Sequence, residues 1–124
     1  MYMDDRNVFG SCLMKDVRDK TIKRMFKYVL GQFKSPNTRD IQSGVSVLDD
    51  STKELIEKFV VESVDNCLFN MLIMLDERDD SFKVSIDTDG KKIWLQDGSG
   101  DLEELFYFWR DDYGEFKNDF YNAV

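Results

Sequence analysis

The first regular spacing of apolar residues predicts an amphipathic helix over residues 15–34. The apolar positions recur at steps of three and four, at Ile22, Met25, Phe26, Val29, Leu30 and Phe33. Ser35-Pro36-Asn37 then ends the helix. The basic side chains beside this stripe, at Lys20, Lys23, Arg24 and Lys27, are interpreted as a solvated face. A phosphate-binding patch is the alternative, and the acidic remainder of the chain opposes it.

A second helical pattern predicts a long helix over residues 51–76. Ser51 and Glu54 have the spacing of a capping box at its start. The apolar stripe consists of Val60, Val64, Cys67, Leu68, Met71, Leu72 and Leu75, so Cys67 is expected to be a small core residue. Residues 37–50 are expected to form a loop, with a short strand over residues 41–47 around Gly44.

The period then changes from helical to two, which predicts an antiparallel hairpin over residues 81–96. Asp89-Gly90 supplies the positive-φ pair of a type I′ turn. With that turn, the cross-strand pairs are Ile86 with Ile93, Val84 with Leu95, Asp87 with Lys92, and Ser85 with Trp94. Trp94 therefore lies on the outer face, where either another element covers it or a partner binds it.

The last pattern predicts a helix over residues 101–121 that begins at Asp101, with Glu104 as the reciprocal cap. A core stripe is expected at Leu102, Leu105, Phe106, Trp109, Tyr113, Phe116 and Phe120, with Gly114 as a bend. Three aromatic residues fall off the stripe, namely Tyr107, Phe108 and Tyr121. Phe108 lies between Glu104, Asp111 and Asp112 on the helix surface, so its exposure would need a functional explanation.

These elements give the predicted fold class, a helix-dominated α+β single domain. It consists of three main helices and one antiparallel β-hairpin, with one further short strand as an option. A chain of 124 residues with 42% hydrophobic residues is long enough to bury one core.

Charge separates the two parts of the chain and indicates the kind of partner. The net charge is −8, but residues 15–39 are locally basic at +6 and residues 40–124 carry −13. The last 28 residues hold eight carboxylates and eight of the aromatics. Such a field attracts basic surfaces and repels nucleic acid, so no direct nucleic-acid binding is expected.

Composition also bears on location and chemistry. The chain has no membrane-spanning apolar run, no signal-peptide pattern and only two distant cysteines, so a cytoplasmic, reduced protein is expected. It has no histidine, the usual general base and commonest metal ligand. It also has no nucleophile elbow, P-loop or dinucleotide motif. The sequence therefore predicts neither an enzyme nor a cofactor.

A calcium site is the metal alternative. Residues 87–90 look like part of a calcium loop, but Gln96 stands where a bidentate glutamate is required, and a hairpin turn explains the segment. The alternating oxygens of Asp97, Ser99 and Asp101 are explained by a helix cap.

In size, charge and layout the chain resembles the small acidic immunity proteins of bacterial toxin systems, including contact-dependent growth inhibition. The resemblance rests on the hairpin over residues 86–95, the segment over residues 97–105 and the aromatic helix that follows. It implies a cytoplasmic antitoxin that forms a tight complex with a cognate toxin, often a basic nuclease.

The expected function is therefore an inhibitor that neutralises a basic toxin domain through carboxylates and aromatic contacts. The candidate partner-binding residues are Trp94, Glu104, Tyr107, Phe108, Asp111, Asp112 and Glu115. Two other classes stay open. A nucleic-acid-mimicking phage or plasmid decoy would block a generic basic groove of a host defence enzyme, and a structural subunit would self-associate.

Overall fold

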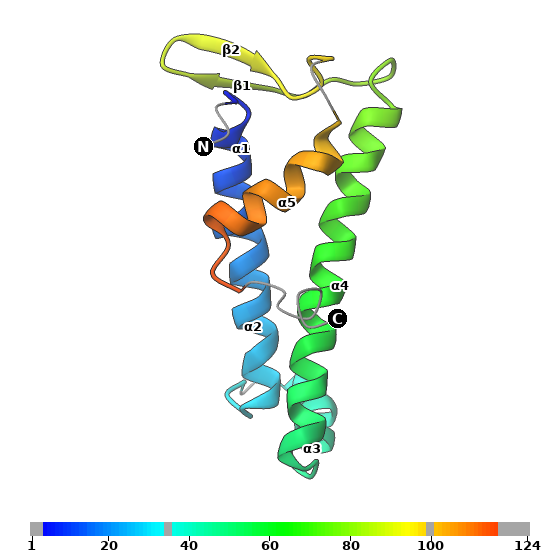
Figure 1. The fold of residues 1–124 in the computed structure, drawn as a ribbon. Helices are drawn as coiled ribbons and strands as arrows, with labels where there is room; N and C mark the ends of the chain where they lie inside the picture. The colour runs from blue at the N-terminus through cyan, green and yellow to red at the C-terminus, as the bar shows by residue number, and fades with distance from the viewer. Residues whose placement is uncertain (1–3, 34–35, 99–100, 117–124) are drawn as a thin grey trace.

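Two long helical segments that run in opposite directions form the frame of the molecule (Figure 1). The structure is a computed structural model that describes residues 4–33, 36–98 and 101–116. The first segment is continuous through α1 (Asn7–Cys12), the π-helix η1 (Leu13–Asp19) and α2 (Lys20–Val29), and the second is α4 (Asp50–Glu77). Helix α5 (Leu102–Tyr113) runs from beside α4 across the front of the first segment, and a two-stranded hairpin lies at their upper end (Figure 1).

The first helical segment corrects the predicted bounds of 15–34 at both ends, since it starts at Asn7 and ends at Val29. In η1 two pairs of neighbouring residues are buried, Leu13 with Met14 and Arg18 with Asp19. This spacing belongs to an i→i+5 helix and does not match a 3.6-residue template. Gly31 ends this helical segment, because its φ of 65° is that of a left-handed residue. Gln32 N donates to Lys27 O and Gly31 N to Tyr28 O, which is a Schellman cap.

Residues 36–46 form helices, so the predicted loop with a strand over residues 41–47 is wrong. The short 3₁₀ helix η2 (Pro36–Thr38) leads into α3 (Arg39–Ser46). Gln42 links this helix to its neighbours, because Phe33 N donates to Gln42 Oε1 at 2.8 Å and Gln42 Nε2 donates to Thr38 Oγ1 at 2.8 Å. Apolar positions at Ile41 and Val45 fit a helical step of four as well as a strand step of two.

The long helix α4 is confirmed within one residue at each end, and Leu68, Leu72 and Leu75 of the predicted stripe are buried, but the cap and the first half of the stripe differ from the prediction. Asp49 is the N-cap and accepts from Thr52 N at 2.8 Å, in place of the expected capping box at Ser51. Hydrogen bonds from Thr52 and Ser51 lower the pKa of Asp49. The buried residues of α4 are Val61, Asp65, Leu68, Leu72 and Leu75. Cys67 is exposed, not a core residue, because the buried stripe is rotated towards Asp65.

The hairpin has the register that the sequence predicted. Strand β1 (Ser85–Thr88) pairs with β2 (Lys91–Trp94), with Ile86 opposite Ile93 and Asp87 opposite Lys92. Asp89 and Gly90 have φ values of 50° and 76°, as a type I′ turn requires. Buried Gln96 attaches the hairpin to the body, since its Nε2 donates to Leu75 O at 2.9 Å and its Oε1 accepts from Val84 N.

The main core lies in the upper half of the molecule, where α1, η1, α4 and α5 meet below the hairpin. Its buried members are Leu13, Met14, Leu68, Leu72, Leu75, Leu95, Leu102, Leu105, Phe106 and Trp109. The structure is therefore a helix-dominated α+β fold, as predicted. None of the helices in residues 4–33, 36–98 and 101–116 combines the length and apolarity needed to cross a membrane.

Candidate partner-binding face of α5

Helix α5 is fixed at its N-terminus by a side chain from α4. Asp101 is the N-cap residue, as predicted, but its side chain makes no capping hydrogen bond. Instead, Leu102 N donates to Asp76 Oδ2 at 2.8 Å. Burial is the main cause of the raised pKa of Asp76, and the nearby charge of Asp101 adds to it. Burial and the same two carboxylates raise the pKa of Glu103.

The inner side of α5 is fixed by close packing around Trp109. Four predicted stripe residues, Leu102, Leu105, Phe106 and Trp109, are buried. The Trp109 ring lies against Gly10 of α1 so closely that a Cβ there would be 2.2 Å from the ring. Trp109 Nε1 also donates to Asn7 Oδ1 at 2.9 Å. These contacts determine the rotation of α5 about its axis.

A buried ionic cluster fixes the C-terminal end of α5. Arg18 of η1 binds Asp65 of α4 through Nε–Oδ1 at 2.6 Å and Nη2–Oδ2 at 3.3 Å, and it contacts Asp19 through Nη1 at 3.1 Å. Arg110 of α5 places Nη1 at 3.8 Å from Asp65 Oδ2. Because all four side chains are buried, each charge depends on the others for compensation.

The chain leaves the helix at Gly114, which confirms the predicted bend. A Cβ there would be 2.7 Å from Arg110 O and 2.8 Å from Arg18 Nη1, so no larger residue fits. Arg18 Nη2 donates to Phe116 O, and Glu115 N donates to Asp19 Oδ2 at 2.9 Å. Phe116 is half-buried and contacts Phe26. The predicted helix over residues 101–121 is therefore too long, since α5 ends at Tyr113 and residues 114–116 are not helical; Phe120 and Tyr121 lie outside the described residues.

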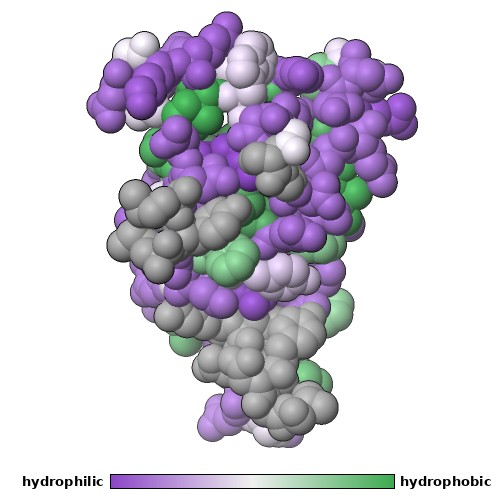
Figure 2. Space-filling view, turned by 45° about the horizontal axis from the view of Figure 1, so that its top comes forward, coloured by the Kyte–Doolittle hydropathy of each residue, from purple (hydrophilic) through white to green (hydrophobic). Residues whose placement is uncertain are grey.

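The outer side of α5 carries a contiguous exposed set that we call the α5 face, namely Glu104, Tyr107, Phe108 and Asp111. These positions follow steps of three and four along one side of the helix. Tyr107 and Phe108 are 47% and 48% exposed, and both carboxylates are exposed. Asp112 is exposed beside Phe108. Where the view in Figure 2 is coloured, the surface is mostly hydrophilic and hydrophobic residues show only in small areas.

The ring of Tyr107 is held in position by its neighbours. Its centroid is 5.7 Å from that of Phe69 and 5.8 Å from that of Phe106, and Arg110 Cζ lies 5.3 Å from the ring centre. A hollow of about 90 Å³ opens next to it between α4 and α5, lined in part by Glu62, Asn66 and Phe69. A rigid aromatic ring beside a small hollow is a common arrangement at the centre of an interface.

The remaining predicted residues lie elsewhere. Trp94 is 41% exposed at the end of β2, and Lys92 Nζ lies 4.9 Å from its ring centre. It thus belongs to the hairpin and not to α5. Glu115 lies beyond the Gly114 bend, where its Oε2 is 2.7 Å from Lys23 Nζ. This ion pair raises the pKa of Lys23 and connects α2 to the segment that follows α5.

Pattern analysis missed the side chains that position the site, which are Arg18, Asp65, Asp76 and Arg110. It assigns charged residues to the surface, as is usual. The sequence held one signal for two of them, because each occupies a position within the apolar spacing of its helix. Arg18 lies four residues from both Met14 and Ile22. Asp65 lies four residues after Val61 and three before Leu68.

A search of protein-family models, of curated proteins and of solved structures found no match to this chain.

Proposed function

We propose that this protein is an immunity or inhibitor protein that neutralises a cognate basic toxin domain, with a nuclease as the first candidate. The observation that supports it best is the α5 face. Tyr107 and Phe108 are exposed side by side between the carboxylates of Glu104 and Asp111, on a helix whose other side is packed into the core.

The two kinds of residue on the α5 face would act differently. The carboxylates attract a cationic surface from a distance and raise the association rate. The aromatic rings bury apolar area after contact and slow dissociation. Because the fold already holds the helix in place, little conformational entropy is lost on binding. In a nuclease complex, the carboxylates would occupy positions where substrate phosphates otherwise lie.

Growth protection tests this function. The gene next to the coding sequence of this protein is expressed as a toxin candidate, alone and together with this protein. The proposal predicts growth arrest with the toxin alone, normal growth with both, and a purified one-to-one complex. Growth arrest that persists during co-expression, with no complex formed, would contradict it. Inhibition of several unrelated nucleases in competition with DNA would instead indicate the nucleic-acid-mimicking decoy.

A further inference from the structure

On the side away from α5, the α2 and α4 pair has an apolar face that no other part of residues 4–33, 36–98 and 101–116 covers. Helix α5 packs on α4 through Asp65 and Phe69, whose ring centroid is 6.1 Å from that of Phe106. Val60, Ser63 and Cys67 point from the other side of α4, as the 100° step per residue requires. A groove of about 440 Å³ lies along this side, and we call it the α2/α4 groove.

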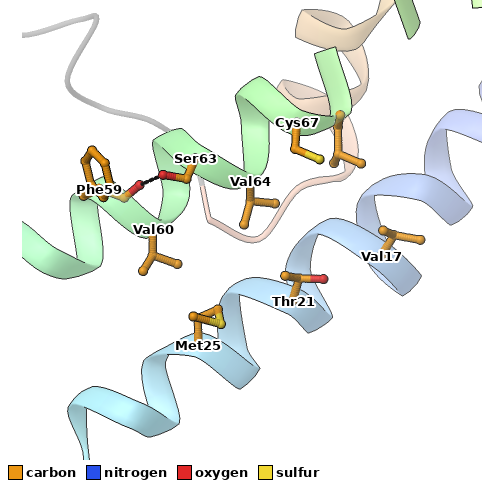
Figure 3. Close-up of a pocket in the computed structure, with 9 residues that line it drawn as sticks. Val17, Thr21, Met25, Phe59, Val60, Ser63, Val64 and Cys67 are labelled. Atoms are coloured by element: carbon orange, nitrogen blue, oxygen red, sulfur yellow. Dashed lines mark hydrogen bonds between the residues drawn. The ribbon is translucent and has the colours of Figure 1, made fainter. Parts of the chain in front are cut away.

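The α2/α4 groove is almost entirely apolar. Its lining residues are Val17, Thr21, Met25, Phe59, Val60, Ser63, Val64, Cys67 and Leu68. Figure 3 shows Val60 and Val64 of α4 pointing towards the helix that carries Thr21 and Met25. Ser63 Oγ donates to Phe59 O at 2.7 Å, so its hydroxyl is satisfied within α4. Phe59 is 72% exposed at the edge of the groove.

The charge on the two rims differs, and this difference indicates the occupant. Lys20, Arg24 and Lys27 are exposed along α2 next to the groove, at steps of four and three. Ser63, Asn66 and Asn70 are exposed along the α4 rim at similar steps and carry no charge. Although the whole chain carries −8, this rim is locally positive. A matching surface therefore has an apolar centre and carboxylates on one flank.

We propose that the α2/α4 groove binds an acidic amphipathic helix of a protein partner. The helix would lie between α2 and α4, with its apolar side on Val60 and Met25 and its carboxylates next to Lys20, Arg24 and Lys27. The groove from Val17 to Met25 spans about 12 Å, or two helical turns, which suits an i, i+3, i+4, i+7 pattern of contacts. This site is additional to the α5 face and does not depend on the proposed inhibitor function.

Other occupants fit the groove less well. A second copy that pairs through the same groove offers the same three cations and the same uncharged α4 rim, so it supplies no matching carboxylates there. An extended peptide that binds by strand addition needs a free strand edge, and the strands β1 and β2 lie at the far end of the molecule (Figure 1). A flat anionic bilayer could contact the cations but could not enter a concave groove.

Two exposed cysteines provide a reporter and its control. Cys67 lines the groove, whereas Cys12 is exposed in α1 and does not line it. The probe is an 18-residue helical peptide with leucine at i, i+3, i+4 and i+7 and glutamate on one flank. A second peptide with lysine in place of glutamate is the matched control. Maleimide labelling of each cysteine is followed by mass spectrometry, and peptide affinity is measured by fluorescence anisotropy.

We expect the glutamate peptide to slow labelling of Cys67 about tenfold at saturation and to leave Cys12 unchanged, while the lysine peptide has no effect. The Lys20→Glu, Arg24→Glu, Lys27→Glu variant should reverse this preference. Ser63→Trp fills the groove from an exposed position and should abolish binding, whereas Ser43→Trp on exposed α3 should not. A melting curve for each variant shows that the fold is retained.

Several results would overturn the proposal. One is equal protection of Cys67 by both peptides, or by neither. Another is slow labelling of Cys67 without peptide, together with dimers or larger assemblies in sedimentation, which would assign the groove to a second copy. Protection by phosphatidylglycerol vesicles but not by the glutamate peptide would assign it to a membrane surface. None of these results changes the growth-protection test of the α5 face.

Discussion

The α5 face and the α2/α4 groove are both exposed and both partly apolar, but they are built in opposite ways. The α5 face is a convex row of aromatic rings and carboxylates on a helix whose other side is buried around Trp109. The groove is concave, with an apolar floor and a basic rim, and it lies between α2 and α4 on the side away from α5. Because the charges beside the two faces differ in sign, we propose a basic partner for the α5 face and an acidic one for the groove.

The buried ionic cluster around Asp65 lies between the two faces and supports both. Its loss should therefore lower the stability of the fold more than any other substitution proposed for these faces. Asp65→Asn removes the carboxylate shared by Arg18 and Arg110 and leaves their buried charges uncompensated. We expect the free energy of unfolding to fall by about 3–5 kcal/mol, as measured by urea denaturation. Asp79→Asn, at an exposed position, is the control and should change nothing. An unchanged midpoint for Asp65→Asn would show that the faces do not share this support.

Gly10→Ala tests the packing of α5 alone. The added Cβ would overlap the Trp109 ring, which must shift or tilt the helix. Overpacking of this kind costs about 1–3 kcal/mol, and the near-ultraviolet circular dichroism of Trp109 should change with it. Because Gly10 does not border the α2/α4 groove, the labelling rate of Cys67 should stay the same. A change in Cys67 labelling without a loss of stability would contradict this separation.

Phe108→Ala separates binding from stability. Truncation of a central aromatic side chain should weaken toxin binding about tenfold to a hundredfold, or roughly 1–3 kcal/mol. Stability should change little, because the ring is nearly half exposed. Phe82→Ala is the matched control, since Phe82 is 44% exposed on the loop before β1. Calorimetry that gives equal affinities for the two variants would remove Phe108 from the site.

Substitutions of Asp76, which caps the start of α5, should have the smallest effect on stability, and that effect should depend on pH. Asp76→Ala removes the acceptor for Leu102 N and should cost about 1 kcal/mol, whereas Asp76→Asn keeps an acceptor and removes a charge that Asp101 repels. Since the pKa of Asp76 is raised in the fold, its charged form destabilises the native state. The Asn variant should therefore be the more stable protein at neutral pH. This advantage should disappear as the pH falls through the raised pKa towards 3.8, the ordinary value. A constant difference across this range in thermal melts would contradict the prediction.

The sequence predicted the elements whose periodicity is regular. The hairpin register follows from Asp89-Gly90 and the alternation on either side, because one turn type fixes every cross-strand pair. The long helix α4 was also clear, and so was the position of Tyr107 and Phe108 off the apolar stripe, where the structure exposes both side chains. In each case local spacing alone determines the result.

Other features depend on contacts between distant residues. The π-helix η1 breaks the 3.6-residue period, so the start of the first helix was missed. The cap of α5 comes from Asp76, 26 residues before the amide that it accepts. Buried Asp65 rotates the α4 stripe, which exposes Cys67 and opens the groove, and its two arginine partners come from other helices. No local pattern contains these pairings.

The most direct test of the central claim is the association rate of the toxin domain with two charge-reversed variants at low and high salt. One variant is Glu104→Lys with Asp111→Lys on the α5 face, and the other is Asp79→Lys with Asp80→Lys after α4, with the same change in net charge. We predict that only the first variant lowers the association rate at low salt, by about tenfold or more, and that high salt removes the difference. Equal rates for the two variants would contradict the assignment of the α5 face as the toxin-binding surface.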